Sequence, residues 1–148
     1  MHKKIVSPFT AILAIAFILS SCGNTGSKSK SDKDSLNAKP KVSVYYLHQK
    51  KRCPTCKAVG SISKETTETD FAKEIKEGRV AFFDLDISEP ANDSIGKKFE
   101  CAWSGLYILS VKDGKEKIED LTDFGFMYAI NKPDTLEQKI KTVISENL

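Results

Sequence analysis

The stretch Val42-Ser-Val-Tyr-Tyr-Leu47, separated by five residues from Cys53-Pro-Thr-Cys56, decides the fold. Its first part is rich in β-branched and aromatic residues, which predicts a strand. After the second cysteine the apolar residues Ala58, Val59 and Ile62 recur at helical spacing. The cysteine pair is therefore expected where a strand ends and a helix begins.

The rest of the chain continues this alternation of strands and helices. Phe71, Ala72 and Ile75 resume the helical spacing after a polar middle, which predicts one bent helix or two short ones ending before Gly78. The continuous apolar centre of residues 79–86 predicts a second strand buried on both faces. The later elements are a helix at 92–100, a strand at 106–111, a hairpin turn at Asp113-Gly114, an edge-like strand at 116–120, a short helix at 122–128 capped by Thr122, and a final helix after Pro133. The order β-α-β-α-β-β-α predicts an α/β domain whose central mixed sheet of about four strands is flanked by helices.

Residues 1–21 are typical of a bacterial export signal. A basic start precedes an apolar run at 9–19, which is of signal-peptide length and too short for a bilayer-spanning helix. The run ends in Leu19-Ser20-Ser21-Cys22, which resembles the lipobox in which the cysteine receives the lipid. The alternative is a soluble secreted protein with a free Cys22. Residues 22–40 are then expected to be a lipidated cysteine and a polar, disordered tether, and residues 41–148 are expected to be the folded domain.

Charge and composition exclude several classes of site. Removing Lys3 and Lys4 with the signal leaves 21 basic residues against 20 acidic ones, so no nucleic-acid partner is expected. Only His48 remains among the histidines, which argues against sites built from several imidazoles. No glycine-rich phosphate loop follows a strand, so no flavin or other cofactor is expected in this chain.

The pair Cys53 and Cys56 has the spacing of a redox-active disulfide. At a helix N-terminus, unpaired N–H groups favour the thiolate, which is the attacking species. The positive charges of Arg52, Lys57, Lys50 and Lys51 also favour the thiolate. Pro54 suits the first turn of a helix. In this interpretation Cys53 attacks and Cys56 resolves the mixed disulfide.

Two other interpretations of the pair stay open. A static disulfide is possible in an exported protein, although so short a loop constrains little entropy. A zinc or copper site is the second, with His48 and Cys101 completing four ligands. Cys101 alone is either a third thiol or a small buried hydrophobe. The single Trp103 either flanks the disulfide or covers the core, and His48 is expected to face solvent at the strand end.

The motifs around the pair resemble a known group of proteins. The order of elements, Cys53-Pro-Thr-Cys56-Lys57 and Phe82-Phe-Asp-Leu-Asp86 look like the thioredoxin superfamily over residues 41–148. A narrower resemblance is to the nitrophenyl compound nitroreductase subunit ArsF family, which are small thioredoxin-like bacterial proteins, often exported. That resemblance is carried by the following short motifs: Tyr46…His48…Arg52-Cys53…Thr55-Cys56-Lys57-Ala58, Trp103-Ser104…Leu106 and Leu121-Thr122…Phe124…Phe126.

This resemblance implies an active pair at Cys53 and Cys56. It places Arg52, Pro54, Thr55, Lys57, Trp103, Ser104 and Gly105 beside a substrate. One departure is that thioredoxins carry a cis-proline before the third strand, where this chain has Trp103-Ser104-Gly105. The expected protein is a lipid-anchored, periplasm-facing thiol–disulfide exchange protein of the bacterial cell envelope. Its partner would be a protein or a small thiol, and the family name implies an accessory part in nitro-compound reduction. A non-catalytic metal-binding or partner-binding module is the alternative.

Overall fold

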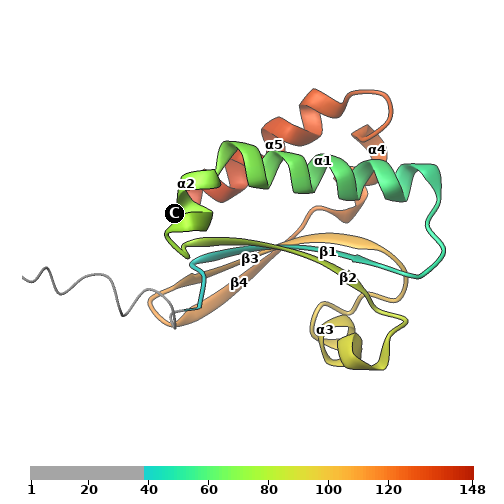
Figure 1. The fold of residues 1–148 in the computed structure, drawn as a ribbon, viewed down its shortest axis with the longest axis horizontal. Coiled ribbons are helices and arrows are strands. Elements are labelled where there is room, and N and C mark those ends of the chain that lie inside the picture. The colour runs from blue at the N-terminus through green and yellow to red at the C-terminus, as the bar shows by residue number, and fades with distance from the viewer. Residues whose placement is uncertain (1–38) are drawn as a thin grey trace, which may run out of the picture. The chain divides into compact units, whose positions relative to one another are not determined.

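The structure is a computed structural model that describes residues 39–148, and its centre is a mixed four-stranded sheet (Figure 1). The strand order is β2-β1-β3-β4. The middle pair β1–β3 and the hairpin β3–β4 are antiparallel, whereas β1 and β2 run parallel. The strands span Val42–His48 (β1), Val80–Asp86 (β2), Gly105–Lys112 (β3) and Lys115–Asp120 (β4). The predicted mixed sheet of four strands is confirmed.

Helices cover both faces of this sheet. Packed on one face are α1 (Pro54–Asp70), α2 (Ala72–Lys76), α4 (Thr122–Tyr128) and α5 (Pro133–Glu146). The other face carries the 3-10 turn η1 (Pro90–Asn92) and the short helix α3 (Asp93–Lys98). The arrangement is thioredoxin-like, as the sequence predicts.

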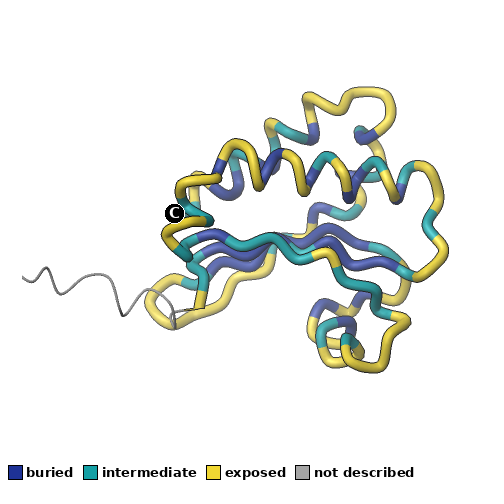
Figure 2. Tube along the Cα trace, viewed as in Figure 1, coloured by how far each residue is buried: buried dark blue, intermediate teal, exposed yellow. Residues whose placement is uncertain are grey.

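The alternation of side chains along β1 divides the core into two clusters. Figure 2 shows buried residues along the sheet and at intervals along α1. Val42, Val44 and Tyr46 point toward α1 and α5 and are fully buried. Leu47 points to the opposite face, where it packs with Phe99 at the end of α3. Burying a side chain of this size contributes about 1.5–3 kcal/mol. The larger cluster therefore holds α1, and with it the cysteine pair, against the middle of the sheet.

The helical segment after the cysteines is divided at Phe71, not in its polar middle. Helix α1 continues through the polar stretch, where Ser63, Thr66 and Thr67 are buried. The Thr67 hydroxyl donates to the Ser63 carbonyl oxygen at 2.7 Å, which satisfies that polar group within the helix. Of the two predicted possibilities, two helices are present, and the second is only the five residues of α2.

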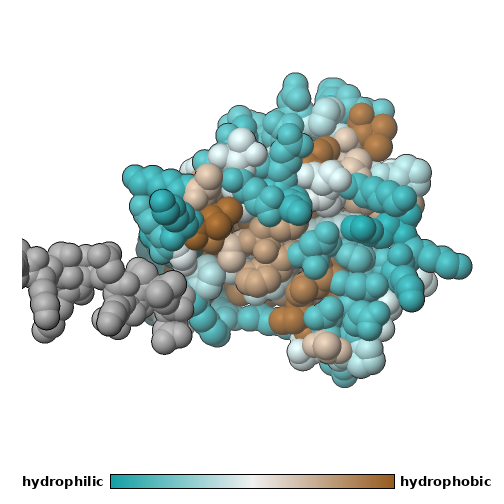
Figure 3. All heavy atoms as spheres, viewed as in Figure 1, coloured by the Kyte–Doolittle hydropathy of each residue, from teal (hydrophilic) through white to brown (hydrophobic). Residues whose placement is uncertain are grey.

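The prediction that β2 is buried on both faces is wrong. This strand lies at the edge of the sheet and pairs only with β1, so most of its residues are partly exposed. Its partly buried Phe82 and Phe83 pack on opposite faces, Phe82 in the larger core cluster and Phe83 stacked on Tyr45 with ring centroids 4.7 Å apart. Figure 3 shows apolar side chains gathered on the side of the domain along which β2 runs.

The hairpin between β3 and β4 turns at Asp113 and Gly114, as predicted. Both residues have positive φ, 52° and 74°, which is what a tight two-residue turn requires. The prediction that Thr122 caps α4 is wrong, because the position before the helix is Leu121 and makes no side-chain cap. The Thr122 hydroxyl instead accepts a hydrogen bond of 3.1 Å from the Leu106 backbone N–H, and so ties α4 to β3.

The chain begins β1 beside its own C-terminus. The Lys41 ammonium group donates to the backbone carbonyl oxygen of Leu148, the last residue. The opposite end of β1 leads into the cysteine pair. The predicted signal peptide, Cys22 and the tether up to residue 38 lie outside the described residues. Within residues 39–148, none of the helices has the length and apolar character needed to cross a membrane.

Candidate functional site

The predicted cysteine pair forms a disulfide at the N-terminus of α1. Cys53 and Cys56 are bonded, with their Cα atoms 5.0 Å apart. Cys53 is exposed and occupies the N-cap position, whereas Cys56 lies in the first turn and is buried to 9% exposure. Pro54 follows the cap, where its missing N–H leaves no bond unmade. One sulfur is thus presented to solvent and the other is shielded.

A backbone N–H group points at the exposed sulfur. The Cys56 N–H donates to Cys53 Sγ at 3.0 Å, and the Lys57 N–H donates to the Cys53 carbonyl oxygen at 3.0 Å. The Lys57 bond is the first i→i−4 bond of α1, whereas the Cys56 N–H is one of the donors that a helix N-terminus leaves without an intrahelical partner. Because the positive end of the helix dipole lies at the same place, negative charge on Cys53 Sγ is stabilised there.

A buried tyrosine of β1 is hydrogen-bonded to the backbone of the cysteine pair. The Tyr46 hydroxyl donates to the Cys56 carbonyl oxygen at 2.6 Å. Burial raises the pKa of Tyr46 above its usual value, and the nearby positive charge of Arg52 only partly opposes this shift. The phenol therefore stays protonated and keeps its donor role. Gly60 allows the close approach, because a Cβ at that position would lie 2.5 Å from Tyr46 Cε1.

A second polar group lies at the end of β1. His48 Nε2 is 3.0 Å from Asp84 Oδ1, and His48 Nδ1 is 2.9 Å from the Gln49 carbonyl oxygen. The other carboxylate oxygen of Asp84 is 3.8 Å from Arg52 Nη1. The expectation that His48 faces solvent is wrong, because the residue is only 8% exposed and its ring packs beside Tyr46. Asp84 thereby joins the loop before Cys53 to the edge strand β2.

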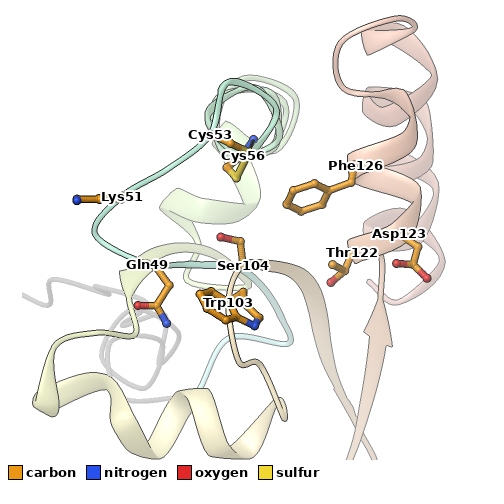
Figure 4. A pocket seen from close by; sticks show the side chains of 9 residues that line it. All are labelled: Gln49, Lys51, Cys53, Cys56, Trp103, Ser104, Thr122, Asp123 and Phe126. Carbon is orange, nitrogen blue, oxygen red and sulfur yellow. Dashed lines mark hydrogen bonds between the residues drawn. A yellow bond between two sulfur atoms is a disulfide. The ribbon is translucent and has the colours of Figure 1, made fainter.

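The disulfide opens onto a groove of about 380 Å³. Its lining is Gln49, Lys51, Cys53, Cys56, Trp103, Ser104, Thr122, Asp123 and Phe126. The Phe126 side chain points from α4 toward the pair, with Trp103 and Ser104 on the segment before β3 (Figure 4). Trp103 is 77% exposed and does not cover the core. The groove is therefore aromatic on two sides and ends at the sulfur atoms.

The remaining predicted substrate-flanking residues divide between two places. Arg52, Pro54, Thr55 and Lys57 belong to the loop and first turn that carry the pair, where they surround the disulfide without lining the groove. Gly105 is buried outside the groove. A Cβ at that position would overlap the Tyr107 ring, so its role is close packing at the start of β3.

The predicted alternative zinc set is not assembled. Cys101 is a free, buried thiol in the cluster beneath α3, and His48 is engaged by Asp84. Among residues 39–148, no group of three or more histidine, cysteine, aspartate or glutamate side chains is placed to hold a metal ion.

Sequence reasoning missed part of the groove wall. Gln49 lines it and donates through Nε2 to the Ala102 carbonyl oxygen at 3.1 Å, which joins the β1–α1 loop to the segment carrying Trp103. No motif marks this glutamine. Phe126 and Thr122 belong to Leu121-Thr122…Phe124…Phe126, one of the motifs on which the resemblance rests. The spacing of its aromatic residues was the available signal for this wall of the groove.

This arrangement is compatible with thiol–disulfide exchange, since a CxxC-spaced disulfide lies on an α/β sheet fold with one sulfur exposed. Comparisons with family models, curated proteins and solved structures found no match to this chain.

Proposed function

We propose that this protein exchanges thiols and disulfides with a protein or small-thiol partner, as a member of the thioredoxin superfamily. The observation that carries the proposal is the asymmetry of the pair. Cys53 is exposed and its sulfur accepts the Cys56 N–H at 3.0 Å, whereas Cys56 is buried. An incoming partner therefore reaches Cys53 first, and Cys56 is placed to complete the exchange.

In the reducing direction, the Cys53 thiolate attacks one sulfur of a partner disulfide. A bond forms between Cys53 Sγ and that sulfur, and the other partner sulfur leaves as a thiolate. The Cys56 thiolate then attacks Cys53 Sγ, which closes the Cys53–Cys56 disulfide and releases the second partner thiolate. Two electrons pass to the partner, and the oxidising direction is the reverse sequence.

The location and the biological partner rest on the sequence alone. The lipobox-like Leu19-Ser20-Ser21-Cys22 supports a lipid anchor in the bacterial cell envelope, facing the periplasm. The resemblance to the nitroreductase subunit ArsF family supports an accessory redox role beside an enzyme that reduces nitro compounds. Replacing Cys22→Ser tests the anchor, since unchanged membrane fractionation would refute it.

Insulin reduction driven by dithiothreitol tests the exchange activity. The purified protein should accelerate it, and Cys53→Ser should abolish the acceleration because the attacking sulfur is gone. Cys56→Ser should accumulate a mixed disulfide on Cys53, detectable by mass spectrometry, because the resolving thiol is missing.

Cys101→Ala is the matched control, because it removes a cysteine outside the pair and should keep turnover. Metal content and free thiols are measured on the same samples. One zinc or copper ion per reduced chain, with no turnover, would instead support the metal-binding module.

A further inference from the structure

Two lysines beside the disulfide lack an acidic partner. Lys51 and Lys57 are exposed, and neither takes part in an ion pair within residues 39–148. Of the other two basic residues of the cluster, Arg52 lies 3.8 Å from Asp84, whereas Lys50 also takes part in no ion pair among the described residues and does not line the groove. The uncompensated positive charge around Cys53 therefore includes Lys51 in the groove wall and Lys57 on α1.

These two lysines flank the exposed sulfur from different elements. Lys51 lies in the loop two residues before Cys53 and lines the groove. Lys57 lies on α1 four residues after the N-cap Cys53, and its backbone N–H donates to the Cys53 carbonyl oxygen at 3.0 Å. The one acidic residue in the groove wall is Asp123, on α4 at the opposite side from Lys51 (Figure 4). The electrostatic potential next to Cys53 is thus positive.

The groove adds an apolar surface to this charge. Phe126 points toward the pair and Trp103 lies at the other wall (Figure 4). Trp103 is 77% exposed, and an aromatic side chain of this kind covers about 150–250 Å² when it is buried in a contact. A segment of polypeptide is large enough to cover that area, whereas a small thiol occupies only the space at the sulfur atoms.

We propose that the partner is a polypeptide whose reactive cysteine is flanked by acidic residues, with an apolar side chain that enters the groove between Trp103 and Phe126. This proposal rests on the proposed function and names the substrate class of the same site. The bonds made and broken are those of the exchange given above. The lysines contribute recognition, because opposite charges accelerate encounter and fix the register of binding.

Three cyclic peptide disulfides that differ only beside one cysteine test the proposal. The flanking residues are glutamate, glutamine or lysine, and an apolar residue is common to all three. Initial rates of reduction by the full-length reduced protein should fall in that order, on the order of tenfold from glutamate to lysine in dilute buffer. The difference should shrink in 1 M salt, where the screening length is about 3 Å.

The double variant Lys51→Glu/Lys57→Glu should reverse the order of the three peptides. A change in the intrinsic reactivity of Cys53 affects all three rates equally, so the ratio of rates isolates recognition. The matched control is Lys64→Glu/Lys73→Glu, which changes net charge by the same amount. Lys64 lies about 16 Å along α1 from Cys53, so this variant should keep the wild-type ratio.

Equal rates for the three peptides, or oxidised glutathione reduced faster than the glutamate peptide, would overturn the proposed partner while leaving the exchange activity intact. If the protein reduces neither insulin nor any of the three peptides, the proposed function itself is overturned.

Discussion

The phenol of Tyr46, at the centre of the sheet, donates a 2.6 Å hydrogen bond to the carbonyl oxygen of Cys56, the buried member of the disulfide. The bond connects the buried core of the domain to the first turn of α1. Because Tyr46 is fully buried and Cys56 nearly so, water cannot replace the interaction. The position of the cysteine pair is thus coupled to the packing of the core.

Tyr46→Phe should lower the free energy of unfolding by about 1 kcal/mol, the net value of one hydrogen bond. The ring and its packing are kept, so the loss reports the hydroxyl alone. Urea unfolding of the oxidised protein measures it. Tyr45→Phe, at the neighbouring position of the same strand, is the control and should change stability by less than about 0.5 kcal/mol. Equal losses in the two variants would contradict a special role for Tyr46.

Gly60→Ala should destabilise the protein, although alanine is the better helix former by about 1 kcal/mol. The added Cβ would lie 2.5 Å from Tyr46 Cε1, and overpacking of this kind costs about 1–3 kcal/mol. Gly96→Ala is the matched variant, because its Cβ meets its nearest neighbour at 3.6 Å. Gly96→Ala should therefore raise the free energy of unfolding by up to about 1 kcal/mol. Thermal unfolding of the two variants should show shifts of opposite sign.

Ser63→Ala should raise the free energy of unfolding by about 1–2 kcal/mol. The Ser63 hydroxyl oxygen is buried and has no hydrogen-bond partner, so its removal ends a desolvation cost and improves helix propensity. Thr67→Val, one turn later, is the contrasting variant. Its hydroxyl donates to the Ser63 carbonyl oxygen at 2.7 Å, so this change should destabilise. A loss of stability in Ser63→Ala would show that the hydroxyl is satisfied.

The turn after β2 should make part of the stability dependent on acid pH. Hydrogen bonds from the Ser88 hydroxyl and backbone N–H lower the pKa of Asp86 below its usual value. A carboxyl whose pKa is lowered by folding stabilises the native state above its unfolded pKa of about 3.9. That contribution is lost as pH falls through the folded pKa.

Asp86→Asn should therefore be less stable than the wild type at pH 7, and the difference should disappear at about pH 2. Urea unfolding as a function of pH measures both proteins. A difference that does not change with pH would show that the charge of Asp86 is not involved.

The element order was predictable because each strand and helix has its own periodicity. Errors arose where neighbours outside the local sequence decide burial. Residues 79–86 have the apolar centre typical of an inner strand, but the chain places β2 at an edge. The polar residues Thr66 and Thr67 resemble a break in the helix, but they are buried within α1.

The candidate site divides in the same way. The cysteine pair was predictable, because its chemistry depends on a spacing of three residues and on the start of one helix. The groove depends on segments far apart in the chain, with Gln49, Trp103 and Phe126 brought together by the sheet. His48 was misassigned because its partner Asp84 lies on another strand.

The direction of β1 also decides how the domain can be held. Lys41, at the beginning of this strand, is joined to the C-terminal residue, and the disulfide follows its far end, about 23 Å away for seven extended residues. A linker or resin attached through the C-terminal residue is thus kept a strand's length from the reacting sulfur atoms. Immobilising the protein by its C-terminus should leave the groove accessible to redox partners.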